Sequence, residues 1–174
     1  MEKWMAYARD LGFAHVQSLD MATLDFRGDI RAMCALNLCG QYHQCRTCPP
    51  VCGDPETCRR RLKEYSRGFL VQTLVSLKTG SLAQLQDAGS QCHRERFTAL
   101  CEALYPEYPQ ALCLISGGCR VCQVCAWPEP CPHPEKAVSC PTGYGLLTPK
   151  VLRDNGIHRD DEDVLGFTGF VLLP

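Results

Sequence analysis

Four cysteines between residues 119 and 131 are spaced in a way that suits an iron–sulfur cluster. They form the pattern Cys-x2-Cys-x2-Cys-x5-Cys-Pro, with thiols at Cys119, Cys122, Cys125 and Cys131. Bacterial ferredoxins use C-x2-C-x2-C-x3-C-P, in which closely spaced thiolates hold one cluster. Gly117 and Gly118 precede the pattern and permit the unusual backbone angles of such a loop. In ferredoxins with two clusters the fourth cysteine binds the other cluster. Here the last spacer is five residues instead of three, so we predict that Cys131 closes the same cluster and that these four thiols bind one cluster.

A second set of four cysteines lies nearer the N-terminus, at Cys34, Cys39, Cys48 and Cys52. Pro49 and Pro50 stiffen the last turn, so less entropy is lost when this loop closes on a metal. We predict a second cluster here, although the spacing alone does not identify iron. Cys45 forms a C-x-x-C pair with Cys48, so a redox dithiol and a zinc site are competing interpretations, and Cys58 could replace a ligand.

Zinc is a weaker interpretation for residues 119–131, because zinc sites usually take paired cysteines separated by a longer loop. His43 and His133 lie within the two cysteine segments, and either could ligate or donate a hydrogen bond to a cluster sulfur. Tyr42 is expected to pack over the first site. Cys92, Cys101 and Cys113 should be core residues. Cys140 could be a fifth thiol beside the second cluster, but we expect an ordinary, partly buried cysteine.

The composition favours metal binding over a disulfide scaffold. The chain has 174 residues, of which 14 are cysteine and 45% are hydrophobic. Disulfide-rich proteins are usually short, secreted and poor in core. The N-terminal stretch carries Lys3, Arg9 and Asp10, so it fails as a signal peptide and is typical of a polar-faced helix. We therefore expect a cytoplasmic protein, in which clustered thiols bind metal more often than they form disulfides.

Charge and hydropathy exclude two other partner classes. The formal net charge is −1, so no overall positive field attracts nucleic acid. No apolar run approaches the roughly 18 to 20 residues that cross a bilayer, so no membrane span is expected. A basic run between Arg59 and Arg67 is most simply a solvated helix face; the alternative is a docking surface for an acidic redox partner.

The elements that must position these cysteines alternate along the chain. Strands are predicted at 14–20, 68–77, 111–116 and 164–173, the last one following the charged run Arg159 to Asp163. Helices are predicted from Pro55 to about Ser66, with Asp54 as cap, and over 81–105 and 144–155. The predicted fold is an α/β single domain over 1–174, with a mixed or largely parallel sheet of about four strands, flanking helices and two cysteine loops, 34–52 and 119–131.

The cysteine patterns resemble a known family, the predicted metal-binding proteins called domain of unknown function 2284. The similarity covers C-x4-C-x-x-Y-x5-C-P-P-x-C, which runs from Cys34 to Cys52, and G-x-C-x2-C-x2-C with a later C-x-x-P-E-K, which runs from Gly117 to Lys136. It implies a cluster-binding or metal-binding protein and carries no specific activity. One departure is Ser139-Cys140-Pro141-Thr142, where family members tend to have Ser-x-Glu-Ala, so any role of that glutamate is absent here.

We predict a protein with two [4Fe-4S] clusters that transfers electrons to a partner protein. The first alternative is a redox or sulfur-transfer enzyme whose first cluster leaves one iron open to substrate. The second is an interaction module stabilised by zinc. No Ser-His-Asp arrangement, phosphate-binding glycine loop or paired carboxylates suggest other chemistry, and the sequence leaves open whether the chain is an enzyme and which oligomer it forms.

Overall fold

The computed structural model describes residues 1–158 and 163–174, so residues 159–162 of the predicted charged run lie outside the described residues. Four strands form one sheet in the order β1-β2-β4-β3, and every neighbouring pair is antiparallel. The strands are β1 (His15–Ser18), β2 (Arg67–Ser76), β3 (Leu112–Ile115) and β4 (Val164–Leu173). The α-helices are α1 (Glu2–Asp10), α2 (Gly28–Ala32), α3 (Pro55–Leu62), α4 (Leu82–Leu104) and α5 (Thr148–Asp154).

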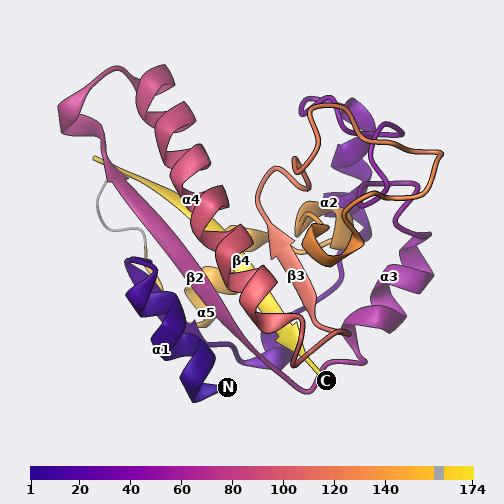
Figure 1. The fold of residues 1–174 in the computed structure, drawn as a ribbon, viewed down its shortest axis with the longest axis horizontal. Helices are drawn as coiled ribbons and strands as arrows, with labels where there is room; N and C mark the ends of the chain where they lie inside the picture. Colours follow the sequence, from indigo (N-terminus) through magenta and orange to yellow (C-terminus); the bar gives the residue numbers. More distant parts are fainter. Residues whose placement is uncertain (159–162) are drawn as a thin grey trace.

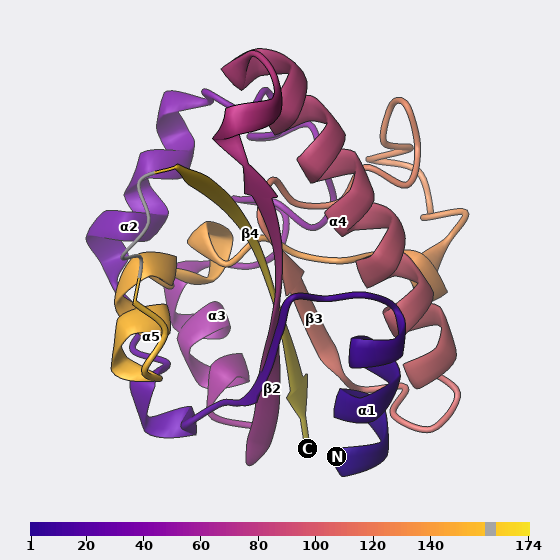
Figure 2. The same cartoon turned by 90° about the vertical axis from the view of Figure 1, so that its left-hand side faces the viewer.

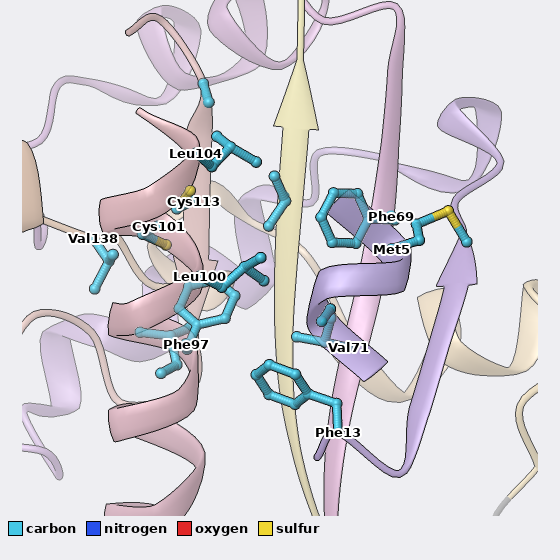
Figure 3. Close-up of a cluster of buried hydrophobic side chains, with 14 of the residues drawn as sticks. Met5, Phe13, Phe69, Val71, Phe97, Leu100, Cys101, Leu104, Cys113 and Val138 are labelled. Atoms are coloured by element: carbon cyan, nitrogen blue, oxygen red, sulfur yellow. The ribbon is translucent and has the colours of Figure 1, made fainter. Parts of the chain in front are cut away.

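The helices cover both faces of the sheet, as Figure 2 shows with the sheet between them. On one face α1 and α4 pack against side chains of alternate strand positions, including Phe69, Val71 and Val171. Figure 3 shows this cluster around Phe97 and Leu100 of α4. The other positions of the same strands, such as Leu70 and Phe170, pack beneath α3 and α5. β2, β3 and β4 are buried on both faces over most of their length, so they are mostly apolar instead of alternating with polar residues, whereas the edge strand β1 is largely exposed.

The predicted parallel arrangement of the sheet is wrong, although the prediction of four strands with flanking helices is confirmed. Helix α4 does connect two strands that run in the same direction, since β2 and β3 are both antiparallel to β4. The C-terminal strand β4 inserts between them and pairs with each. An apolar strand buried on both faces is typical of parallel sheets, but here the burial comes from helices on both sides of an antiparallel sheet.

The helix predicted over 144–155 is shorter in the structure, where α5 begins at Thr148. Gly145 has a positive φ of 67°, which a helix cannot continue through. A Cβ atom at this position would lie 2.8 Å from the carbonyl oxygen of Arg27, so the close approach to the segment before α2 also requires glycine. The turn at 142–145 therefore packs against both α2 and α3, the two helices that flank the first cysteine segment.

Candidate metal centre

Two long segments carry the predicted ligands, and both lie at the same end of the molecule. The first runs from the end of α2 to the start of α3, and the second follows β3; Figure 1 shows them beside each other above α3. Asp54 caps α3 through a 2.7 Å bond from the Thr57 amide to its Oδ1 atom, which confirms the predicted helix start just after Cys52. The first segment is therefore held by a helix at each end.

Two glycines turn the second segment against the first. Gly117 and Gly118 have φ values of 87° and 68°, which side chains rarely adopt, as the sequence predicted. A Cβ atom on Gly118 would lie only 3.2 Å from the Sγ atom of Cys48. The absence of a side chain at Gly118 thus lets the second cysteine segment approach the first.

The segment that follows the second loop is fixed along the free edge of β3. The Ser139 amide donates to the carbonyl oxygen of Cys113 at 3.0 Å, and the Ile115 amide donates to the carbonyl oxygen of Ser139 at 2.8 Å. This short pairing leads directly into Cys140. The half-buried Cys140 thiol lies close enough to Cys34 and Cys48 to raise the pKa of each, so it belongs beside the first group.

The four cysteines of the ferredoxin-like pattern line one cavity of about 580 Å³. A fifth thiol in its wall, Cys45, comes from the first segment. His133 also lines the cavity, whereas the ring of His43 packs edge to face against Tyr42. A cavity walled by five thiols suits soft, thiolate-binding metals such as iron in clusters or zinc.

Cys45 connects the two groups. Its thiolate accepts hydrogen bonds from the thiols of Cys119 and Cys48, and these bonds lower the pKa of Cys45. The same bonds, together with burial, raise the pKa values of Cys48 and Cys119. Two sites that the sequence places about 70 residues apart are therefore in direct contact.

The first group is looser. Burial is the main cause that raises the pKa of Cys34 to about 11, and the neighbouring Cys140, Cys39 and Cys52 thiols add to it. Cys39 is exposed, while Cys48 is buried. The four predicted thiols are therefore neighbours, joined by Cys140, which the sequence analysis did not include among the ligands.

A buried arginine lies at one side of the first group. Arg31 is 7% exposed, and its Nη1 atom lies 3.2 Å from the Cys58 sulfur and 3.7 Å from the Cys52 sulfur. Its guanidinium also donates to the carbonyl oxygens of Gly143 and Gly53. A hydrogen bond with the Cys58 thiol is the main cause that lowers the pKa of Cys52 to about 6, and Arg31 lowers it further. The same hydrogen bond, together with burial, raises the pKa of Cys58. Arg31 supplies positive charge where thiolates would gather.

The thiols are gathered but not closed around a single ion. All fourteen cysteines are free, which is inconsistent with a disulfide scaffold. Among the residues with described coordinates, no three His, Cys, Asp or Glu side chains are arranged to hold a metal ion. The donors that line the cavity are nevertheless thiols, the ligand type that soft metals, among them iron in clusters and zinc, prefer.

Sequence reasoning did not include Arg31, Cys45 and Cys140 among the site residues. The C-x-x-C pair with Cys48 was a sequence signal for Cys45. Arg31 and Cys140 come close to the first cysteine group only through the fold, Arg31 beside Cys52 and Cys140 beside Cys34. Of the three predicted core cysteines, Cys101 and Cys113 are buried, whereas Cys92 is only partly buried. No helix in the described part of the chain has the length and apolarity to cross a bilayer.

The comparisons with known proteins give a family. A family model described as "Predicted metal-binding protein (DUF2284)" matches residues 17–173. No curated protein and no solved structure matches the chain. The match covers both cysteine segments and all four strands except the start of β1.

Proposed function

The chain belongs to the DUF2284 family of predicted metal-binding proteins, and we propose that it binds two [4Fe-4S] clusters and transfers electrons to a partner protein in the cytoplasm. The observation that carries this proposal is the cavity lined by Cys45, Cys119, Cys122, Cys125 and Cys131. Iron–sulfur clusters supply one-electron chemistry when bound. The protein would hold the second cluster in this cavity and the first among Cys34, Cys39, Cys48 and Cys52.

The contact between the two groups supports electron transfer rather than two separate structural sites. Cys45 touches Cys119 of the second group and Cys48 of the first. Arg31 adds positive charge at Cys52 and Cys58, which stabilises added negative charge and so favours a reduced site. Such a pair of adjacent sites with a buried compensating cation suits a protein that accepts and releases electrons.

The surface around the cysteine segments suits a transient partner. Exposed apolar side chains gather there, namely Met33, Leu36, Leu38, Val124 and Trp127, with Leu38 at 90% and Val124 at 82% exposure. Exposed apolar patches often mark interaction sites. The basic run is a weaker candidate, because its arginines have separate contacts: Arg59 pairs with Glu56, and Arg67 lies over the Tyr108 ring. We therefore expect the redox partner to dock on the cysteine end.

Iron and sulfide analysis of anaerobically purified protein tests the proposal. We expect about eight iron and eight sulfide per chain, as two four-iron clusters require. Electron paramagnetic resonance of the reduced protein should show interacting paramagnetic centres, because the sites are adjacent. A colourless, redox-silent protein that binds zinc tightly and little iron would instead support the zinc-stabilised module.

A second candidate function is a cluster-dependent redox or sulfur-transfer enzyme, and one observation favours it. A cavity of about 1090 Å³ borders Cys52 of the first group. A substrate could enter there if one iron of the first cluster lacked a protein thiolate. Four protein ligands on each cluster would exclude this function, and three ligands at the first cluster would favour it.

A further inference from the structure

The cavity beside Cys52 is large enough for a small organic molecule, since ligand sites usually have about 300 to 1,000 Å³. Its wall is built from five parts of the chain: the first cysteine segment, the end of α3, the region from the end of α4 to β3, residues 134–139, and Tyr144. Figure 1 shows the edge strand β3 between α4 and α3, and the cavity wall takes residues from all three elements.

One side of the cavity presents an arginine that is held in place but lacks an acidic partner. The Nη1 atom of Arg61 donates to the Tyr144 hydroxyl oxygen at 3.0 Å, and Tyr65 lies close enough to raise the pKa of the guanidinium. Tyr144 is fully buried, so it holds the guanidinium rigidly. Arg61 itself is exposed, and within residues 1–158 and 163–174 it forms no ion pair with a carboxylate.

The other charges of the cavity wall leave a positive surplus. Lys136 pairs with Glu102 at 2.7 Å, so these two charges cancel. Arg46 donates to the carbonyl oxygens of Pro128 and Glu129, which carry no net charge. Glu135 is the remaining acid, so three cations face two carboxylates. An anion is therefore the ligand that this wall favours.

Part of the wall is apolar. Pro106, Pro109, Ala111 and Leu112 line it between the end of α4 and β3, and Val51 lines it from the first cysteine segment. An inorganic anion would leave this surface in contact with water. A carboxylate with an apolar body would use both sides, because arginine binds carboxylates with two parallel hydrogen bonds and the body buries apolar area.

We propose that this cavity binds a small organic carboxylate, with the acid group against Arg61 and the apolar body against Leu112 and its neighbours. The molecule would lie next to Cys52, beside the first cysteine group. The binding site depends only on residues of the cavity wall, so it does not rest on the identity of the metal. An organic acid bound in this cavity would contact the first cysteine group at Cys52.

Calorimetric titration of the anaerobically purified full chain with phenylbutyrate tests this site. Phenylbutylamine, with the same body and a positive group, and inorganic phosphate, with no apolar body, are the matched probes. We expect phenylbutyrate to bind and both other probes to bind at least tenfold more weakly. Arg61→Gln should weaken phenylbutyrate binding by about tenfold or more, which corresponds to about 1.4 kcal/mol.

Arg59→Gln is the control, because Arg59 lies on the same helix but contacts Glu56 and the Phe26 ring. It should bind phenylbutyrate as the native protein does, and Arg61→Lys should retain part of the affinity. Equal binding of all three probes, equal affinity of Arg61→Gln and Arg59→Gln, or no phenylbutyrate binding at about 10 mM would overturn the proposal.

Iron content and far-ultraviolet circular dichroism, measured on the same samples, separate this proposal from that of the clusters. We expect Arg61→Gln to keep the native iron content and fold while losing phenylbutyrate binding. Native binding in a chain that holds no iron would sustain the carboxylate site and reject the clusters. A full iron complement without phenylbutyrate binding would sustain the clusters and reject the carboxylate site.

Discussion

Cys45 lies far in the sequence from the second cysteine pattern, yet the fold places it among those cysteines. It lines the cavity of the second group and contacts Cys119. Cysteine spacing describes one segment at a time, so a ligand contributed by another segment is invisible until the segments are packed together. At the residue scale, the candidate metal centre thus takes its thiols from two loops.

Cys45→Ser should lower the iron and sulfide content of the anaerobically purified protein, because it removes a thiolate from the wall of the cavity. The effect should be a loss of up to about half of the iron, one cluster of two. Cys92→Ser is the matched control, since Cys92 lies on α4 outside both cysteine segments. If both variants retained the native iron content, Cys45 would have no part in metal binding.

His93 gives the protein a pH-dependent stability that is independent of the cysteines. It is 1% exposed, its Nδ1 atom lies 3.0 Å from the Thr73 hydroxyl, and burial lowers its pKa from 6.5 to about 4. As the pH falls from 6.5 to 4, the unfolded chain takes up a proton before the folded one does. The free energy of unfolding should therefore fall by roughly 3 kcal/mol across this window.

His93→Gln, which keeps a polar group but cannot titrate, should flatten this part of the pH dependence. Urea unfolding at pH 7, 5.5 and about 4.5 gives the comparison. His158→Gln, at an exposed position, should keep the native slope. An unchanged slope in His93→Gln would show that other groups cause the acid sensitivity.

At the scale of elements, α4 illustrates why a glycine within a helix need not interrupt it. Gly89 lies inside α4, which is continuous from Leu82 to Leu104. A Cβ atom at Gly89 would lie 2.4 Å from the Phe167 ring and 2.8 Å from Val75. The glycine is needed for close packing of the helix on β2 and β4, where its neighbours cannot move without disturbing the core.

Gly89→Ala should lower the free energy of unfolding by about 1 to 3 kcal/mol, because the clash exceeds the gain of about 1 kcal/mol in helix propensity. Thermal and urea unfolding measure the loss. Gly28→Ala, at the first residue of α2 where nothing lies within 4 Å, is the control and should be neutral or slightly stabilising. Equal stability of the two variants would contradict this account of Gly89.

The start of α3 makes a second prediction at this scale. Asp54→Ala removes the side-chain cap at the Thr57 amide and should cost about 1 kcal/mol of stability. Asp54→Asn should retain nearly all of it, because asparagine caps helices as well as aspartate does. Urea unfolding compares the two variants, and a loss in Asp54→Asn as large as that in Asp54→Ala would mean that the carboxylate charge, not the cap, stabilises the helix.

At the scale of the whole molecule, the sheet and the cysteine segments are distinct in what stabilises them. Two apolar clusters, one on each face of the sheet, bury Phe69, Leu70, Phe170 and their neighbours without help from a metal. The cysteine segments contain short turns and few strands or helices. Stability is therefore not uniform, and we expect the segments around the thiols to depend most on a bound metal.

Removal of the metal should leave the sheet folded and loosen the cysteine segments. In hydrogen exchange, amides of β2 and β4 should remain protected in the metal-free protein, whereas residues 34–52 and 117–133 should lose protection. The comparison uses one preparation before and after anaerobic chelation. Loss of protection throughout the chain would mean that the metal is required for the fold itself, as in the zinc-stabilised alternative.

The sequence by itself determined the strands, the long helix, the Asp54 cap and the two cysteine patterns, because apolar periodicity, capping residues and ligand spacing are local properties. Only the tertiary structure decided that the sheet is antiparallel, since the direction of a strand depends on where β4 inserts. It also decided which thiols meet: Cys45 with Cys119, and Cys140 with Cys34. These contacts join distant segments, and no local pattern encodes the packing that brings them together.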